Sequence, residues 1–473
     1  MRLRYSIALL MVLPLLTGCS SVTETTPTLP TPVEQYVARY DGPGNGEDMA
    51  NAMAVDATGN VFVTGLSTGN GTGWDYATVK YNNSGKQLWV ARYNGPGNGD
   101  DVANSLVLDS KGNVYITGWS VGNGTSYDYA TIKYDNTGTQ LWVARYNGSG
   151  NGEDLASSLA VDSAGNVYVT GRSTGSNNDV GYTTIKYDNN GNQLWVALFK
   201  SSGNGNDFAH ALAVDMEGNV YVTGEAAGTL GGGGGGSPGT TTIASTGTGY
   251  YATIKYDNDG NQLWEAKYKG IGNGDDIAHS LKVDKSGNVY VTGESLGNGT
   301  GYDYATIKYD GDGKQLWVTR YNGAGNGNDG ALDMGLDGLG NICVTGYSAG
   351  SSSRDYATIK YDSSGKELWT ARYSGLTNGD NVAHSLVTDS AGNVYVAGQS
   401  GFNYNTGTYE DYVTIKYDEN GSQVWIARYS NGQKSRNLAN SLTLDTAGNV
   451  YVTGGSTTNE TDYDYVTTKY KQP

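Results

Sequence analysis

QLWVARY at residues 87–93 is the stretch that decides the fold, because the chain repeats it with few changes. Its tryptophan recurs at steps of 52, 53 or 56 residues, with one step of 69. The positions are Trp89, Trp142, Trp195, Trp264, Trp317, Trp369 and Trp425. A faded eighth copy, QYVARY at residues 35–40, precedes them. A fixed period of this length indicates an array of one supersecondary unit.

Each repeat contains four short phrases rich in Val, Ile, Thr, Tyr and Trp, the composition of β-strands. Examples are strand a at residues 158–162 (SLAVD), strand b at 166–171 (NVYVTG) and strand c at 128–134 (DYATIKY), and the tryptophan phrase is strand d. Asp and Gly occupy the a–b and c–d joints, as in DSAGN at 162–166, and favour tight turns. We therefore expect two antiparallel hairpins in each repeat.

The order of the phrases predicts how the array ends. Phrase d comes first, at residues 34–40, and phrase c comes last, at residues 464–470. Pairing these two completes one blade and leaves no open edge at the seam. Both faces of each strand carry bulky groups, so each sheet must pack between two neighbours, as in a propeller. We predict an all-β, eight-bladed β-propeller of four-stranded antiparallel blades, closed by pairing the N-terminal strand with the C-terminal blade; a linear solenoid is the alternative.

A family resemblance agrees with this fold. The segment AHSLKVDKSGNVYVTG at residues 278–293 closely resembles the bacterial SBBP-type β-propeller repeat and is similar to the NHL repeat. The resemblance covers essentially all of residues 34–473. It implies that strand a lines a central channel and that strand d lies at the rim. It implies no catalytic residues, because neither family has a shared catalytic set to map onto this chain.

The N-terminus is predicted to be an export signal with a lipid anchor. Arg2 and Arg4 precede an apolar stretch at residues 7–16 that is too short to span a bilayer. LTGCS at residues 16–20 resembles a bacterial lipobox, which implies cleavage before Cys19 and lipid attachment to its thiol. An ordinary secreted protein is the alternative.

These features divide the chain into three parts. We expect a lipoprotein signal peptide at residues 1–18, a Thr/Pro-rich tether at 19–33 and one propeller domain at 34–473. The protein would then be an exported, membrane-anchored lipoprotein, at the outer membrane or cell surface if the cell is Gram-negative. The membrane contact would be only the lipid anchor. Cys343 is then the one remaining cysteine and is expected to be a buried free thiol.

The net charge of −17 argues against nucleic-acid binding, which uses basic patches. We expect a monomer whose partner is a protein or a surface polysaccharide. The b–c and d–a loops lie on one face of a propeller, here named the b–c face, and they vary most, so we expect ligands to bind there. One of these loops carries an insertion at residues 226–249 that includes six consecutive glycines.

The d–a loops are rich in Gly, Asn and acidic residues, as in GPGNGED at residues 42–48. Their last acid recurs as Asp48, Asp101, Asp154, Asp207, Asp276 and Asp329, and is replaced by Asn381 and Asn437. Clustered carboxylates suit calcium. The preferred interpretation is that each Asp caps its loop by accepting backbone N–H bonds, with no cofactor and with calcium as the alternative.

Four aromatic residues are candidate ligand contacts, because each precedes or opens strand c on the b–c face. They are Trp74, Tyr127, Tyr302 and Tyr463. The alternative is that they cover the loops beneath them. Three histidines share one repeat position, which the other units fill with Asn, Ser or Gly: His210, His279 and His384, against Asn51, Asn104, Ser157, Gly330 and Asn440. We interpret this position as a polar edge of strand a.

No nucleophile motif, phosphate loop or paired-histidine metal signature occurs in the sequence, and no catalytic residue is proposed. We therefore predict a non-catalytic, lipid-anchored cell-envelope propeller that acts as a binding scaffold. A glycan-binding, lectin-like propeller is the first alternative. An envelope enzyme with its site at the channel mouth is the second, and it would require the repeat symmetry to break.

Overall fold

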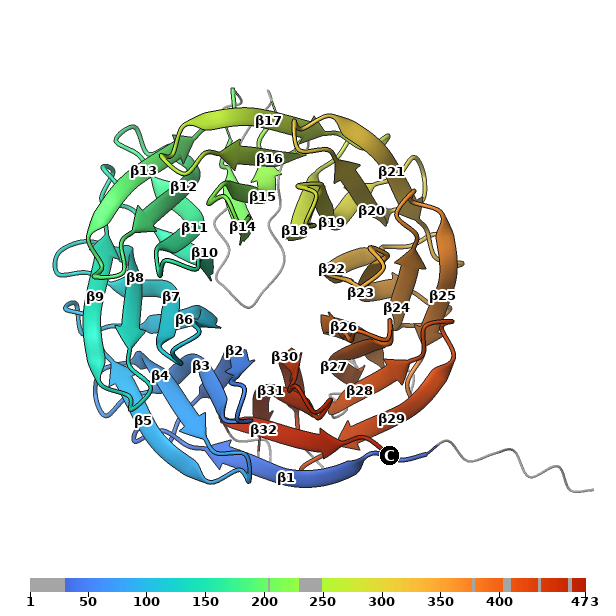
Figure 1. Ribbon diagram of the computed structural model, residues 1–473, viewed down its shortest axis with the longest axis horizontal. Helices are drawn as coiled ribbons and strands as arrows, with labels where there is room; N and C mark the ends of the chain where they lie inside the picture. Colours follow the sequence, from blue (N-terminus) through green and yellow to red (C-terminus); the bar gives the residue numbers. More distant parts are fainter. Residues whose placement is uncertain are drawn as a thin grey trace, which may run out of the picture.

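The computed structural model describes residues 30–202, 205–228, 249–376, 379–402, 410–432, 435–457 and 462–473. These residues form eight four-stranded antiparallel sheets arranged around a central axis, an eight-bladed β-propeller (Figure 1). Residues 1–18, most of the tether, and most of the insertion lie outside the described residues, so the predictions for Cys19 and for the insertion stay predictions. Within the described part of the chain, no helix has the length and apolar character needed to cross a membrane.

Each blade places its strands in order from the channel to the rim (Figure 1). The inner strands are β2 (Asp48–Val55), β6 (Asp101–Leu108), β10 (Leu155–Val161), β14 (Phe208–Val214), β18 (Asp276–Val283), β22 (Gly330–Leu336), β26 (Asp380–Thr388) and β30 (Asn437–Leu444). The second strands are β3 (Val61–Thr68), β7 (Val114–Val121), β11 (Val167–Thr174), β15 (Val220–Ala226), β19 (Val289–Leu296), β23 (Ile342–Ala349), β27 (Val394–Phe402) and β31 (Val450–Thr457).

The remaining strands form the outer half of each blade. The third strands are β4 (Trp74–Tyr81), β8 (Tyr127–Tyr134), β12 (Val180–Tyr187), β16 (Tyr250–Tyr256), β20 (Tyr302–Tyr309), β24 (Arg354–Tyr361), β28 (Asp411–Tyr417) and β32 (Tyr463–Lys471). The rim strands are β5 (Gln87–Tyr93), β9 (Gln140–Tyr146), β13 (Gln193–Phe199), β17 (Gln262–Tyr268), β21 (Gln315–Tyr321), β25 (Glu367–Tyr373), β29 (Gln423–Tyr429) and β1 (Val33–Tyr40).

The two ends of the chain share one blade. The strand order of this sheet is β1-β32-β31-β30, and β1 runs antiparallel to β32, with Val37 opposite Thr468 and Tyr40 opposite Tyr465. In Figure 1 the first and last colours of the chain lie side by side at this blade. The predicted eight blades and their closure by the termini are confirmed, and the ring has no unpaired strand at its seam.

The hairpin turns follow the predicted chemistry. In the a–b turn of the third repeat, the Oδ1 of Asp162 accepts hydrogen bonds from the backbone N–H of Ala164 at 2.9 Å and of Asn166 at 2.8 Å. Gly165 supplies the positive φ of 86° that the turn requires. The recurring turn Asp therefore has a structural role.

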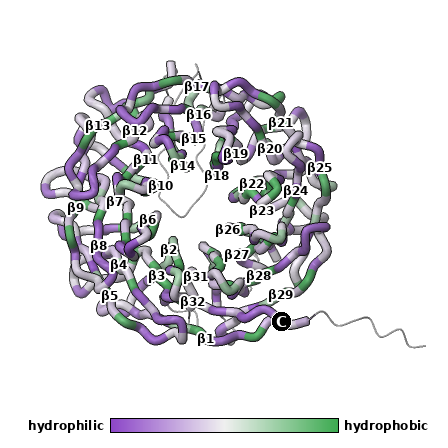
Figure 2. Tube along the Cα trace, viewed as in Figure 1, coloured by the Kyte–Doolittle hydropathy of each residue, from purple (hydrophilic) through white to green (hydrophobic). Residues whose placement is uncertain are grey.

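The core lies between blades, so each blade interface has its own apolar layer. At the seam, Ala50 and Val63 of the first blade pack in one buried cluster with Tyr451 and Tyr465 of the last. Apolar residues recur along the strands of every blade (Figure 2). Cys343 is fully buried and free, as predicted, and burial raises the pKa of its thiol to about 12.

The inner strands each contain a β-bulge that aims one residue at the next blade. Asn51 occupies the bulge of β2, and its Nδ2 donates to the carbonyl of Ala103 on β6 at 2.9 Å. The three histidines occupy this position, as the repeat alignment predicts. One assignment was wrong: in β22 the bulge residue is Leu332 and not Gly330, which lies two residues earlier opposite Tyr347.

Lys80 and Trp89 lie directly opposite each other on β4 and β5, and both reach the next blade. The Nζ of Lys80 donates to the carbonyl of Asn136 at 3.0 Å, and the Nε1 of Trp89 donates to the same carbonyl at 3.1 Å. The ammonium lies 4.7 Å from the ring centre of Phe62. The invariant tryptophan of the repeat is therefore part of the interface between blades.

Candidate functional site

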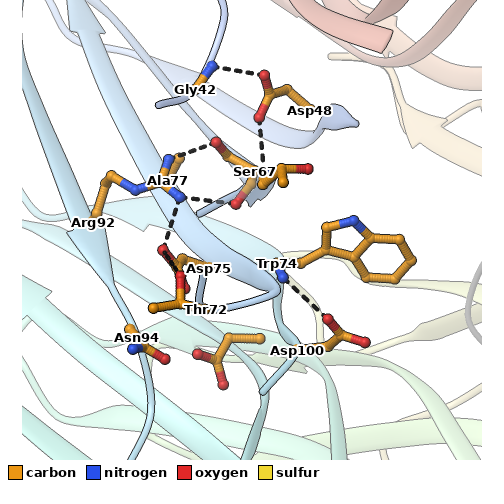
Figure 3. Close-up of polar contacts among 12 residues, drawn as sticks. Gly42, Asp48, Ser67, Thr72, Trp74, Asp75, Ala77, Arg92, Asn94 and Asp100 are labelled. Atoms are coloured by element: carbon orange, nitrogen blue, oxygen red, sulfur yellow. Dashed lines mark hydrogen bonds and ion pairs between the residues drawn. The ribbon is translucent and has the colours of Figure 1, made fainter. Parts of the chain in front are cut away.

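The predicted calcium ligands are buried loop caps. Asp101 is fully buried, and its two carboxylate oxygens accept the backbone N–H groups of Gly95 at 2.6 Å and Val121 at 3.0 Å. Asp48 binds the N–H of Gly42 in the same way at 2.7 Å (Figure 3). Burial raises the pKa of Asp101 to about 6, although these bonds favour the ionised form. The arrangement supports the capping interpretation.

The structure does not gather these carboxylates into one site. Asp48, Asp101, Asp154, Asp207, Asp276 and Asp329 each cap the d–a loop of a different blade, and all are nearly or fully buried. Asn437 fills the same position in the last blade, where its Oδ1 accepts from the hydroxyl of Ser456 at 2.7 Å. One group of three acids in the described ranges, Asp41, Asp48 and Asp464, has oxygens within 4.8 Å of one another. Calcium binding stays a prediction.

A clamp that the sequence analysis missed joins the strands on this face. Arg92 on β5 forms an ion pair with Asp75 on β4 at 2.8 Å and donates to the backbone carbonyl of Ser67 on β3 at 2.9 Å (Figure 3). It also donates to the hydroxyl of Tyr40 on the neighbouring blade at 2.8 Å. The same pairing recurs as Arg145 with Asp128, Arg320 with Asp303, and Arg372 with Asp355.

The sequence contained a signal for this clamp. The two partners disappear together: Gly181 and Leu198 replace them in the third blade, and Tyr250 and Lys267 in the fourth. The clamp explains the strand-c Asp as a structural residue. In both altered blades a lysine two residues later pairs instead with the loop-cap Asp that follows it, Lys200 with Asp207 at 3.3 Å and Lys269 with Asp276 at 3.4 Å.

The four predicted aromatic contacts fall into two environments. Trp74 and Tyr127 are half-buried on adjacent blades and pack against one apolar cluster, and the ring centres of Tyr127 and Trp119 are 4.4 Å apart. We name this the apolar cluster; its members are Leu66, Trp74, Val102, Trp119, Tyr127 and Leu155. Tyr302 and Tyr463 lie instead beside carboxylates, and burial together with these charges raises the pKa of each phenol to about 12.

The residue that follows the glycine of each second strand breaks the repeat most strongly. It lies near the b–c end of the strand and differs from blade to blade: Leu66, Trp119, Arg172, Glu225, Glu294, Tyr347, Gln399 and Gly455. The side chain at this position can reach the next blade: the guanidinium of Arg172 lies 5.0 Å from the ring centre of Phe208 on β14. In the aligned repeats this one position varies while its neighbours in the second strand stay nearly constant. That contrast was visible in the sequence, but it was not used to predict a site.

The variable position divides the ring into unlike sectors. The apolar cluster spans the first three blades, whereas Glu225 and Glu294 bring negative charge to the fourth and fifth. We name Glu225, Asp275 and Glu294 the acidic cluster. The Nε2 of His279 lies 3.3 Å from the Oε1 of Glu294. His279 also faces His210 of the fourth blade, with ring centres 5.8 Å apart.

Glu225 is the most perturbed carboxyl of the acidic cluster. Its side chain is 4% exposed, and among the described residues its Oε2 has no hydrogen-bond partner. Burial, and then the charges of Asp275, Asp207 and Glu294, raise its pKa to about 8. A buried carboxyl with an unpaired oxygen on the b–c face is a chemical feature that the repeat itself does not require.

Comparisons with known proteins agree with this architecture. The family model described as SBBP, beta-propeller repeat, matches residues 88–124, 142–178, 195–231 and 266–299. These four segments are similar to the SBBP β-propeller repeat. An uncharacterized WD repeat-containing protein of Acanthamoeba polyphaga mimivirus is 24% identical over 427 residues, which cover 75% of this chain and 28% of that protein. The propeller thus spans less than a third of the viral relative's length.

Solved structures support the fold of these SBBP repeats. A crystal structure of Sqt1 from Chaetomium thermophilum matches with a TM-score of 0.57 and 10% identity, covering 94% of this chain and all of Sqt1. A second Sqt1 structure matches with a TM-score of 0.55 and 10% identity, covering 93% and 98% of the two chains. At this identity the likeness concerns the fold alone.

Proposed function

We propose that this SBBP-repeat propeller is a non-catalytic binding scaffold that recognises its partner with the b–c face. The observation that carries the proposal is the variable position after the second-strand glycine. The residues that do repeat are explained by turns, loop caps, clamps and blade interfaces. Selective contact requires an arrangement of unlike groups, and this face offers a tryptophan, an arginine and two glutamates at equivalent places.

A retention experiment tests this function. The immobilised proteins are wild type, Trp119→Ser on the b–c face, and Lys111→Ser as the control. Lys111 lies in the exposed a–b turn of the same blade. Because Trp119 is 4% exposed and its loss weakens the packing of the blade, half-buried Trp74→Ser is tested as a fourth protein, and melting temperatures report folding. Retention of a cell-envelope component that is lost with a folded b–c variant and kept with Lys111→Ser supports the proposal. Equal retention by all four proteins would contradict it.

The proposed setting is the cell envelope, with the propeller attached through a lipid on Cys19. The lipobox-like segment supports this part of the proposal. Cys19→Ser should move the protein from the membrane fraction to the soluble fraction and abolish incorporation of a labelled fatty acid. Unchanged fractionation would contradict the anchor without bearing on the b–c face.

A glycan ligand is the alternative to a protein partner. Half-buried Trp74 and Tyr127, beside the apolar cluster, are the observation that favours it, because sugar rings pack on aromatic faces. A glycan array probed with wild type and Trp74→Ser separates the two classes. A glycan bound by wild type and lost in the variant supports the lectin reading.

A further inference from the structure

We propose that the acidic cluster is a recognition site for one arginine side chain of a protein partner, with the guanidinium held between Glu225 and Asp275. This inference rests on the proposed function, because it assigns a partner chemistry to the same b–c face. The cluster lies between the fourth and fifth blades, where β15 ends and β18 begins.

The two carboxylates face a common volume beside Gly249. The Oδ1 of Asp275 lies 3.1 Å, and the Oε1 of Glu225 3.2 Å, from the point where a Cβ on Gly249 would lie. The N–H of Gly249 donates to the same Oδ1 at 2.9 Å, which fixes the orientation of Asp275. A side chain at position 249 would lie in tight contact with both oxygens, so the glycine lets the two carboxylates approach the same point.

The ionised form of Glu225 has an unpaired oxygen in the described structure, and burial therefore favours the protonated carboxyl until a cation binds. A buried carboxylate without hydrogen bonds loses the solvation it has in water, and this loss is large unless a cation or donor replaces the water. The second oxygen of Glu225 has no such donor in the described structure. Asp275 and Glu294 add negative charge around it, so a bound cation would relieve both burial and repulsion.

Guanidinium suits this spacing better than a metal ion does. A bare divalent ion draws its oxygen ligands close together, and in the described ranges the three acids of the cluster do not bring their oxygens within 4.8 Å of one another. A guanidinium carries five N–H donors in a wide plane and can bond to separate carboxylates. Its three-methylene stem lets a charge reach a group that is 4% exposed.

Tyr302 borders the same cluster from β20. Its half-buried phenol is close enough to Asp275, Glu294 and Glu225 for their charges to raise its pKa. An aromatic ring beside paired carboxylates is a surface on which a guanidinium plane stacks. Tyr302, predicted from the sequence as a ligand contact, gains a specific role in this site.

The experiment is a calorimetric titration of the propeller with acetyl-Gly-Arg-Gly-amide. The citrulline peptide of the same shape serves as the uncharged ligand control. Glu225→Gln is the test variant. Glu217→Gln is the matched control, because Glu217 is exposed in the a–b turn of the same blade and its loss changes the net charge equally. Melting temperatures of both variants report folding. Glu225→Gln should not be destabilised, since the amide is neutral without the proton that the buried carboxyl must take up on folding.

We expect the arginine peptide to bind wild type and Glu217→Gln with equal affinity, and Glu225→Gln at least about ten-fold more weakly. Citrulline should not bind. Equal affinity for wild type and Glu225→Gln would overturn the site, as would an equal loss in both variants, which indicates attraction to net charge alone. A calcium titration that stabilises wild type but not Glu225→Gln would also overturn it.

This test separates the site from the proposed function. If the arginine peptide fails to bind while Trp119→Ser still abolishes partner retention, the acidic cluster is not the contact and the b–c face remains the binding surface. If Trp119→Ser retains the partner as wild type does, but peptide binding requires Glu225, the arginine site is supported and the proposed role of the b–c face as a whole is not.

Discussion

Tyr465 on the last strand donates to the carbonyl of Ala77 in the first blade at 3.0 Å, across the seam where the ring closes. Tyr129 makes the equivalent bond to Thr183 at 3.2 Å between two blades in the interior of the array. The seam therefore repeats this contact of an ordinary blade interface, although its two residues are 388 positions apart in sequence.

Removing either hydroxyl should have the same effect. Tyr465→Phe and Tyr129→Phe each remove one donor from a buried carbonyl that a threonine hydroxyl of the same blade also contacts, Thr64 in the first case and Thr170 in the second. The loss of one such hydrogen bond typically costs about 0.5–1.5 kcal/mol of stability. The two variants should lower the melting temperature by similar amounts. A much larger loss for Tyr465→Phe would show that closure is weaker than the other interfaces.

The Arg92–Asp75 clamp should behave as a coupled pair. Arg92→Leu leaves the carboxylate of Asp75, which is largely buried, without its cation, whereas the double change Asp75→Gly with Arg92→Leu reproduces the third blade. The single substitution should destabilise by about 2–3 kcal/mol, and the double should cost less than the sum of the two single changes by about 1 kcal/mol. Denaturant unfolding of wild type, the two single variants and the double variant measures this coupling. If the two single losses simply add in the double variant, Arg92 and Asp75 do not stabilise each other.

Asp101 distinguishes loop capping from calcium binding. Asp101→Ala removes the acceptor of two backbone N–H groups and should lower the melting temperature, while Asp101→Asn should lower it less, because Asn437 fills the same position in the last blade. Calcium or a chelator should leave wild type unchanged. If calcium raises the melting temperature of wild type but not of Asp101→Asn, calcium binding at Asp101 is favoured over loop capping.

The acidic cluster makes stability depend on pH in a definite direction. The pKa of Glu225 is about 8 in the folded protein against 4.5 as its ordinary value, with Asp275, Asp207 and Glu294 facing it. Between these pH values the folded state holds a proton that the unfolded state releases, so stability falls as pH rises from 4.5 to 8. The melting temperature of Glu225→Gln minus that of wild type should therefore be near zero at pH 4 and grow by a few degrees toward pH 8. A difference that does not change with pH would contradict the shift.

The fold was predictable because its signals are local. The turn of Asp162 and Gly165 is contained in five residues, and the order of four phrases was enough to place β1 beside β32. The clamp was harder to find, because Arg92 also binds Tyr40, 52 residues away on another blade. Only the joint loss of the Arg and its strand-c Asp in the third and fourth blades marks the ion pair in the sequence.

The candidate site was harder to predict, because its residues come from neighbouring blades that only the closed ring brings together. Trp74 and Tyr127 were identified as exposed contacts from their place before strand c, and the structure shows them half-buried against Trp119. Glu225 was missed because nothing local distinguishes it. Its chemistry comes from burial and from Asp275 and Glu294, which enter from the next blade.

The most direct test of the account compares two triple variants of the propeller in one retention assay against an envelope extract. One carries Trp119→Ser, Glu225→Gln and Glu294→Gln at the variable position, and the other carries Lys111→Ser, Glu217→Gln and Lys285→Gln in a–b turns on the opposite face. The account predicts that the first variant loses the partner while the second retains it, with both still folded. Loss of the partner only in the second variant, or its retention in both, would contradict the claim that recognition lies where the repeat is broken.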